Sequence, residues 1–222
     1  MSHNKLTKHE LKEDNFVTFV LESWEYIREN QNKFFVGLVA IIVIIAGILW
    51  MNNSRMAARQ TAEAQFSEAM SSYRSGQIKT AEEMFKIVEE RFGNLEEGVS
   101  SSFFLGKCAM LQGRNTEAIG YFEDFIANGD KAPVYMDAAR EGLAVAYENE
   151  RDYLKAAEIY AQLADDLKVN GFMQKTYLMR AADNYKLMGQ NGKAVELLER
   201  VVDLVSGEQK REVEIELELL RG

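Results

Sequence analysis

The sequence contains few of the residues that crosslink a fold or interrupt helices. Of its 222 residues, one is cysteine (Cys108), one is proline (Pro133) and 15 are glycine. A single thiol excludes a secreted fold held by paired disulfides, and so little proline and glycine excludes a collagenous or disordered chain. A β-sandwich would need more turn residues, whereas alanine, leucine, glutamate, lysine and methionine favour helices. The composition therefore predicts an all-α protein.

Side chains for catalysis or metal binding are equally scarce. The only histidines, His3 and His9, lie in the N-terminal tail, which leaves the rest of the chain without an imidazole for a catalytic triad or a zinc site. Cys108 has no histidine near it in sequence, so a small buried thiol is favoured over a nucleophile. Gly189 and Gly192 lack the spacing and the Ser or Thr of a phosphate-binding loop. We expect no catalytic residue, no metal, no cofactor and no enzyme activity.

Positive charge is also in short supply. The chain carries 26 Lys and Arg against 35 Asp and Glu, which gives a net charge of −9 and a pI near 5.0. Nucleic acid is therefore not the expected partner, because phosphate binding needs clustered basic residues. Most of the acidic excess falls after residue 51, which would keep that part of the chain soluble and away from anionic lipid.

One long apolar run departs from this polar average. Residues 34–51 carry no charge and have about the length of a helix that crosses a ~30 Å hydrocarbon core. Lys33 and Arg55 flank the run, and Trp50 lies at its end, where aromatic rings favour the membrane interface. The alternatives are a buried core helix and a signal peptide, which would lie nearer the N-terminus and end in small residues. We interpret residues 34–51 as an uncleaved transmembrane helix.

The charges around the apolar run predict its orientation. Five Lys and Arg precede it, and only Arg55 and Arg59 fall in the first twenty residues after it. Because basic flanks favour the cytoplasmic side, the N-terminus is predicted to be cytoplasmic and the C-terminal part periplasmic or otherwise extracytoplasmic. An unpaired cysteine is compatible with that compartment.

Residues 1–33 form a leader with helical periodicity. Phe16, Val20, Trp24 and Ile27 recur at helical spacing, with glutamates elsewhere around the helix. The basic face of a typical lipid-bound amphipathic helix is missing. Two roles stay open for this predicted helix: it could lie along the bilayer surface or dock on a partner protein.

Residues 62–205 contain one pattern four times. Each copy begins with a small residue, and a turn residue follows seven positions after it. An alanine comes five positions after the turn residue. Two large apolar residues complete the pattern, the first four positions after the alanine and the second three positions after the first. The sets are Ala69, Gly76, Ala81, Phe85, Val88; Gly106, Gly113, Ala118, Phe122, Phe125; Ala144, Arg151, Ala156, Tyr160, Leu163; and Ala182, Gly189, Ala194, Leu198, Val201. Small residues let two helices cross closely, and large ones fill the groove to the next pair. We predict four stacked antiparallel helix pairs, at about 62–98, 99–136, 137–174 and 175–205.

The segments on either side of the repeats complete the predicted architecture. Residues 52–61 lack glycine and proline and are expected to be a helical linker between the apolar run and the first repeat. Residues 206–222 begin with Ser206, a candidate N-cap, and then alternate like a strand. We favour a capping helix there, because a solenoid needs a polar end cap and no other strand is evident to pair with.

The repeat pattern resembles a known family. Gly106-x6-Gly113-x4-Ala118-x3-Phe122 looks like the tetratricopeptide repeat, although the units are longer than usual and Arg151 replaces the expected glycine. The resemblance implies a concave groove lined by the first helix of each pair. When the chain is aligned with the repeats of that family, eleven side chains are expected to point into this groove: Phe66, Met70, Tyr73, Phe103, Lys107, Met110, Glu141, Val145, Met179, Asp183 and Lys186. These could bind a partner polypeptide, or several could simply fill the core between helices.

The order of the parts is similar to that of the ancillary Sec-translocon subunit (YfgM-like) family. The shared features are the acidic and aromatic leader around Phe16, a corner at Asn32 and Lys33, one span ending in Trp50, and an alanine-rich helix into repeats. This resemblance implies a bacterial inner-membrane protein that associates with the translocon, exported chains or periplasmic chaperones.

Two hypotheses for the function follow from these features. The first is a non-enzymatic, membrane-anchored adaptor that holds polypeptide partners, with an apolar methionine-containing groove that can repack around varied segments. The alternative is a scaffold that recruits one dedicated partner in an envelope complex for cell division, outer-membrane biogenesis or secretion. A charged groove that binds a defined peptide terminus would favour the scaffold, and Lys107 and Lys186 keep it open. Neither hypothesis predicts an oligomeric state.

Overall fold

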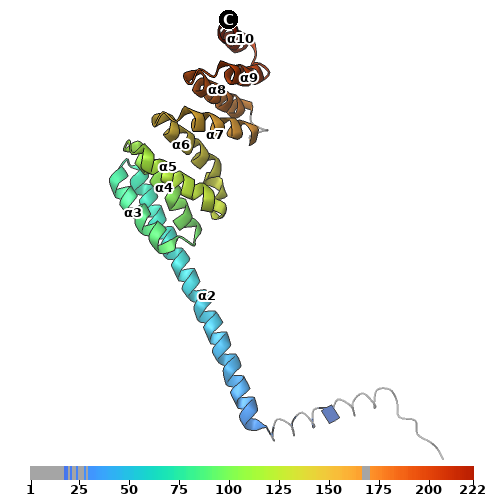
Figure 1. Cartoon of the computed structure of the whole chain (residues 1–222). Coiled ribbons are helices and arrows are strands. Elements are labelled where there is room, and N and C mark those ends of the chain that lie inside the picture. The colour runs from blue at the N-terminus through green and yellow to red at the C-terminus, as the bar shows by residue number, and fades with distance from the viewer. Residues whose placement is uncertain (1–17, 20, 22–23, 25–27, 29, 167–170) are drawn as a thin grey trace, which may run out of the picture. The chain divides into compact units, whose positions relative to one another are not determined.

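The computed structural model describes residues 18–19, 21, 24, 28, 30–166 and 171–222 (Figure 1). The regular elements within these residues are all helical, which confirms the predicted all-α class. They are α2 (Gln31–Arg74), α3 (Ile78–Phe92), α4 (Glu96–Leu111), α5 (Asn115–Asn128), η1 (Gly129–Lys131), η2 (Pro133–Tyr135), α6 (Met136–Asn149), α7 (Tyr153–Asp166), α8 (Gly171–Leu187), α9 (Asn191–Val202) and α10 (Gly207–Arg221). The chain divides into two compact units, Met1–Ala57 and Ala58–Gly222.

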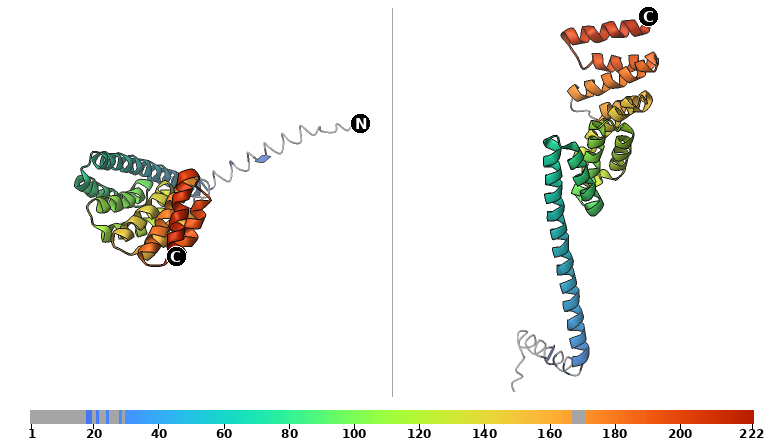
Figure 2. Two further views of the ribbon diagram at one scale, coloured as in Figure 1. Left: turned by 90° about the horizontal axis from the view of Figure 1, so that it is seen from above. Right: turned by 90° about the vertical axis from the view of Figure 1, so that its left-hand side faces the viewer.

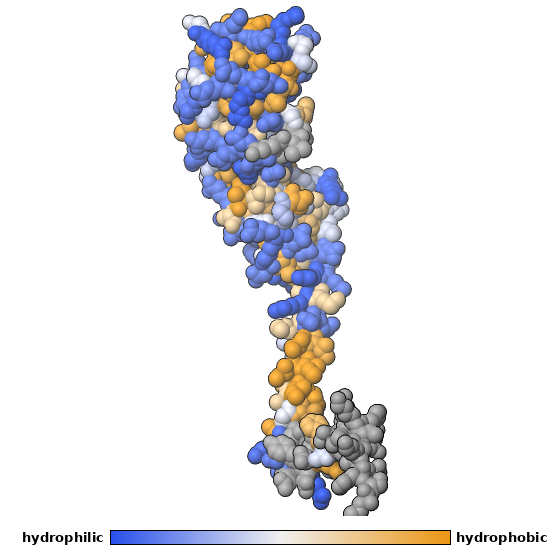
Figure 3. Space-filling view, turned by 90° about the vertical axis from the view of Figure 1, so that its right-hand side faces the viewer, coloured by the Kyte–Doolittle hydropathy of each residue, from blue (hydrophilic) through white to orange (hydrophobic). Residues whose placement is uncertain are grey.

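The first unit contains the apolar part of α2. Its described side chains from Phe35 to Met51 include a continuous series of exposed Val, Ile, Leu and Trp residues, which Figure 3 shows as an apolar surface on the helix. By length and composition, this helix could cross a membrane. The predicted leader helix depends on Phe16, Val20 and Ile27, which lie outside the described residues.

The helices of the second unit pack on their neighbours in chain order from α3 to α10, and the end of α2 packs on α3 through Phe66 and Tyr73 (Figures 1 and 2). The small residue of each predicted repeat is buried, at Ala69, Gly106, Ala144 and Ala182. So are the alanines and large apolar residues of the pattern, including Phe85 and the other members of one continuous core. The helix-pair prediction is therefore confirmed.

The Phe122 ring shows why small residues are needed where these helices cross. It lies between Gly106 of α4 and Gly142 of α6, and a Cβ atom at either glycine would be 2.7 Å from the ring. That separation is far below van der Waals contact, so a larger residue would force the helices apart.

The turns within the four pairs share one backbone conformation. Gly76, Gly113 and Gly189 have φ angles of 78°, 75° and 69°, and Arg151 takes the same left-handed conformation at 63°. Glycine adopts this region freely, whereas a residue with a Cβ atom is strained there. The third repeat thus keeps the geometry of the others although its turn residue differs.

Longer connections and a final helix follow the predicted plan with two differences. The connector around Pro133 contains η1 and η2, with the proline at the first position of η2, where no helical hydrogen bond is lost. Residues 207–221 form α10, so the strand alternative was wrong; Ser206 occupies the N-cap position, but its side chain makes no capping hydrogen bond. The helix α10 is largely polar, as expected of an end cap, but Ile215 and Leu219 remain exposed on it.

Candidate functional site

The eleven predicted groove residues lie on α2, α4, α6 and α8, the first helix of each pair. We call them the inner-face set. Their assignment to a binding groove stays a prediction, and the structure shows how each side chain is packed.

Two aromatic members hold the first two pairs together. The Phe66 and Tyr73 rings of α2 contact Phe104 of α4 at centroid distances of 5.7 Å and 5.6 Å, mostly edge to face. Both also contact Phe85 of α3. Edge-to-face pairs of this kind stabilise a core beyond the area they bury. Phe66 and Tyr73 are therefore partly structural.

Phe103 lies deeper than the other members. It is 5% exposed and stacks on Tyr135 of η2, with ring centroids 5.0 Å apart. The sequence pattern missed Tyr135, because η2 falls in a connector outside the repeat. Little of the Phe103 ring is available to a partner.

The remaining apolar members are partly buried against the core. Met70, Met110, Val145 and Met179 pack on it and keep part of their surface exposed. Phe103 thus fills the core, whereas the methionines keep part of a deformable side chain exposed.

Glu141 is used within the solenoid. Its carboxylate accepts a hydrogen bond of 3.1 Å from the Tyr177 hydroxyl, which joins α6 to α8. Burial, followed by the nearby negative charge of Glu141, raises the pKa of Tyr177. The phenol stays protonated and continues to donate this hydrogen bond at any ordinary pH.

The two lysines of the inner-face set differ in their surroundings. Lys186 is 2.6 Å from Asp183 and also pairs with Glu216 of α10. Burial opposes its charge, but hydrogen bonds to both carboxylates outweigh that effect and raise its pKa. The ammonium group of Lys107, by contrast, makes no hydrogen bond or ion pair with any residue that the structure describes, and the residue is half-buried.

A polar cluster that the sequence did not reveal joins the first two pairs. Glu82 of α3 accepts hydrogen bonds from Gln112 and Arg114 at 2.7 Å and 2.6 Å, and Lys86 is 2.9 Å away. Burial works against the charged carboxylate, yet the bonds from Gln112, Lys86 and Arg114 together lower the pKa of Glu82 to about 2. On sequence alone, Glu82 looks like any exposed glutamate of a helix.

Features of an active site are not evident within the described ranges. No group of three or more His, Cys, Asp or Glu residues there could hold a metal ion. Cys108 is fully buried, as predicted, and burial and the charge of Glu82 raise its pKa to about 11. The thiol is thus protonated at neutral pH and poorly placed to act as a nucleophile.

Comparison with known proteins agrees with this geometry. Residues 66–133 match the tetratricopeptide repeat family. The fold is a tetratricopeptide-like solenoid. Similar solved structures include two crystal structures of kinesin light chain TPR-like repeats from Podosopora anserina, each 22% identical, covering 72% of this chain and 92% of that one with a TM-score of 0.54. BtubC from P. vanneervenii is 13% identical over 68% of both chains, with a TM-score of 0.52. No curated protein is significantly similar in sequence.

These likenesses support the fold and a general role. Tetratricopeptide-like repeats are generally protein–protein interaction modules. At these levels of identity, the solved structures show the fold and carry no information about specific partners.

Proposed function

We propose that the protein is a non-enzymatic adaptor of the bacterial inner membrane, anchored by one helix, which holds polypeptide partners in its extracytoplasmic solenoid. Its resemblance to the ancillary Sec-translocon subunit family suggests that these partners are the translocon, exported chains or periplasmic chaperones. The N-terminus would be cytoplasmic.

The main support is the continuity of α2. One helix, Gln31–Arg74, contains an exposed apolar run and then contributes Phe66, Ala69 and Tyr73 to the first repeat. Exposed apolar side chains on every side of a helix are costly in water and favourable in hydrocarbon. A protein-binding solenoid on such a helix would bind its partners beside the bilayer.

The inner-face set supports binding of unfolded or varied segments. Met70, Met110 and Met179 expose flexible thioether side chains, which can adapt to apolar residues of different shape. Phe103 is a poor position for a probe, because replacing a buried ring would disturb the core.

Site-specific photo-crosslinking in cells would test client binding. A photo-reactive amino acid at Met110 should capture many different nascent exported chains, whereas the same amino acid at Glu158, an exposed residue of α7, should capture few. Equal capture at both positions, or capture of a single folded protein at Met110, would count against an adaptor for exported clients.

One observation favours the scaffold as a second candidate. Lys107 is half-buried and its ammonium group is unpaired within the described structure, so it could bind the terminal carboxylate of one dedicated partner. Once that partner is identified, its C-terminal peptide should bind with a free carboxylate and lose at least tenfold in affinity when amidated. Lys107→Gln should abolish this difference; equal binding of both peptide forms to the unaltered protein would exclude the scaffold mechanism.

A further inference from the structure

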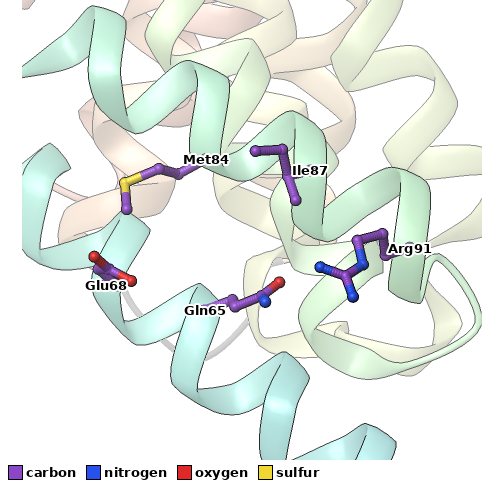
Figure 4. Close-up of a pocket in the computed structure, with 5 residues that line it drawn as sticks. All are labelled: Gln65, Glu68, Met84, Ile87 and Arg91. Carbon is purple, nitrogen blue, oxygen red and sulfur yellow. The ribbon is translucent and has the colours of Figure 1, made fainter.

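A second surface lies at the outer end of the first helix pair. Gln65 and Glu68 of α2 and Met84, Ile87 and Arg91 of α3 line a cavity of about 270 Å³ between the two helices (Figure 4). The cavity is mostly apolar. We call these five residues the end face. They do not overlap with the inner-face set, which lies on other sides of α2 and on later helices.

The internal repeat shows what normally covers this face. The residues of later pairs that correspond to Glu68 are Leu105, Leu143 and Ala181, and all three are buried. Side chains beside them bond to the second helix of the preceding pair. Ser102 of α4 donates to Glu89 of α3, and Tyr147 of α6 donates to Glu123 of α5, both at 2.5 Å. In the later pairs, this side of the first helix therefore packs against the second helix of the preceding pair.

The first pair lacks such a cover among the residues that the structure describes. Glu68 is exposed where the later pairs have a buried residue. Ile87 is an exposed apolar residue, at 48%, whereas the exposed residues at its position in the later pairs are the polar Asp124, Gln162 and Arg200. The Gln65 Oε1 atom is buried yet accepts no hydrogen bond from any described group. A buried amide oxygen without a donor costs free energy, which a donor on an incoming helix would recover.

The charges around the end face indicate the chemistry of the occupant. Glu83 and Glu90 lie four residues before and three after Ile87, on the same side of α3, and Glu68 adds a third carboxylate against one Arg91. The surface is therefore acidic around an apolar centre. A complementary helix would carry Lys or Arg beside its apolar residues.

The C-terminal helix of a second copy of this chain does not fit that requirement. Ile215 and Leu219 of α10 form an exposed apolar ridge that is flanked by Glu212 and Glu218. Docking this ridge on the end face would place carboxylates against carboxylates, which opposes association.

We propose that the end face binds a basic amphipathic helix of another protein, which takes the place of the missing preceding helix. Its apolar residues pack on Met84 and Ile87, its Lys or Arg side chains pair with Glu68 and Glu83, and an N–H or O–H group donates to Gln65 Oε1. This interaction is separate from binding of polypeptides at the inner-face set.

Photo-crosslinking to defined peptides tests the proposal with the full-length, detergent-solubilised protein. Ile87 is replaced by a photo-reactive amino acid and, as a matched control, Leu154 of α7 is replaced in a second variant. Two helical peptides share the same Ile and Leu ridge, and one carries Lys and the other Glu at the flanking positions. The basic peptide should label position 87 at least tenfold more than the acidic peptide does, with little labelling at position 154.

Charge reversal makes the test specific. Glu68→Lys combined with Glu83→Lys should reverse the preference, and Lys107→Glu on the inner face should leave it unchanged. Equal labelling by both peptides would overturn the proposal, as would crosslinks from position 87 to residues 1–29 of the same chain or to a second copy when no peptide is added. None of these results would affect capture of exported chains at Met110. The proposal for the end face and the proposal for the inner-face set can therefore be refuted separately.

Discussion

The two parts of α2 belong to one helix but differ in what surrounds their side chains. Between Phe35 and Met51, apolar residues are exposed on every side, whereas between Ala62 and Tyr73 they occupy one side and pack into the solenoid. Both parts are helical, so helix propensity does not distinguish them. The difference is the period of the apolar residues, continuous in the first part and every three or four residues in the second.

This comparison predicts that substitutions in the first part of α2 weaken membrane retention without changing the stability of the solenoid, and that substitutions in the second part do the reverse. Ile41→Asp combined with Ile45→Asp should give the largest effect, because each charge costs roughly 2.5–3.5 kcal/mol at the centre of a membrane helix. Carbonate extraction of membranes should release this double variant and retain the unaltered protein. The thermal unfolding of its solenoid should not change. If the variant stayed in the membrane pellet, the apolar run would not be the anchor.

The solenoid should depend on pH in a way that membrane retention does not. The pKa of Glu82 falls from 4.5 to about 2 on folding. Its stabilisation is therefore complete above pH 4.5 and is lost as the pH falls through the interval between these values, by about 3 kcal/mol. Glu82→Gln should lower the free energy of unfolding at pH 7 and have much less effect near pH 2, as measured by urea denaturation.

The exposed neighbour provides the control for that experiment. Glu83→Gln should change the free energy of unfolding by less than about 0.5 kcal/mol at either pH. A Glu82→Gln effect of the same size at pH 7 and pH 2 would contradict the assigned role of the Glu82 charge.

A size change in the second part of α2 should disturb only the solenoid. Ala69 is fully buried where the helices cross, so Ala69→Leu should overpack the first pair and cost about 1–3 kcal/mol. The matched change Ala64→Leu, at an exposed position of the same helix, should have little effect. Thermal denaturation distinguishes them, and equal melting temperatures would show that the first pair is not closely packed at Ala69.

The smallest predicted effect is an increase in stability. Arg151 has a φ angle of 63°, in the region where the turns of the other pairs have glycine. Arg151→Gly should relieve this strain and raise the free energy of unfolding by about 0.5–1 kcal/mol, whereas Gly113→Ala should lower it by a similar amount. If Arg151→Gly were destabilising, the Arg151 side chain would have to contribute more than its backbone costs.

The repeat architecture could be predicted because its signal lies in residue size. Ala69, Gly106, Ala144 and Ala182 stand where helices cross, and only small side chains fit there. The repeat spacing likewise predicted a turn at Arg151, although arginine itself has no preference for turns. These constraints act at fixed sequence spacing, so they are visible without the structure.

The detailed packing of the site could not be predicted in the same way. Phe103 and Lys107 are four residues apart on one side of α4, yet one is buried against Tyr135 and the other is half-exposed. That difference depends on η2, which follows no repeat. The Glu82 cluster joins residues about 30 positions apart, and the opposite charges alone do not identify such a pairing.

The proposed function requires that one helix anchors the solenoid on the extracytoplasmic side of the membrane. Protease treatment of bacterial spheroplasts that express the full chain with a C-terminal epitope tests it most directly. We predict that the epitope is cleaved in intact spheroplasts while the chain remains in carbonate-washed membranes. An epitope that resists protease until the spheroplasts are lysed, or a chain that carbonate releases, would contradict this account.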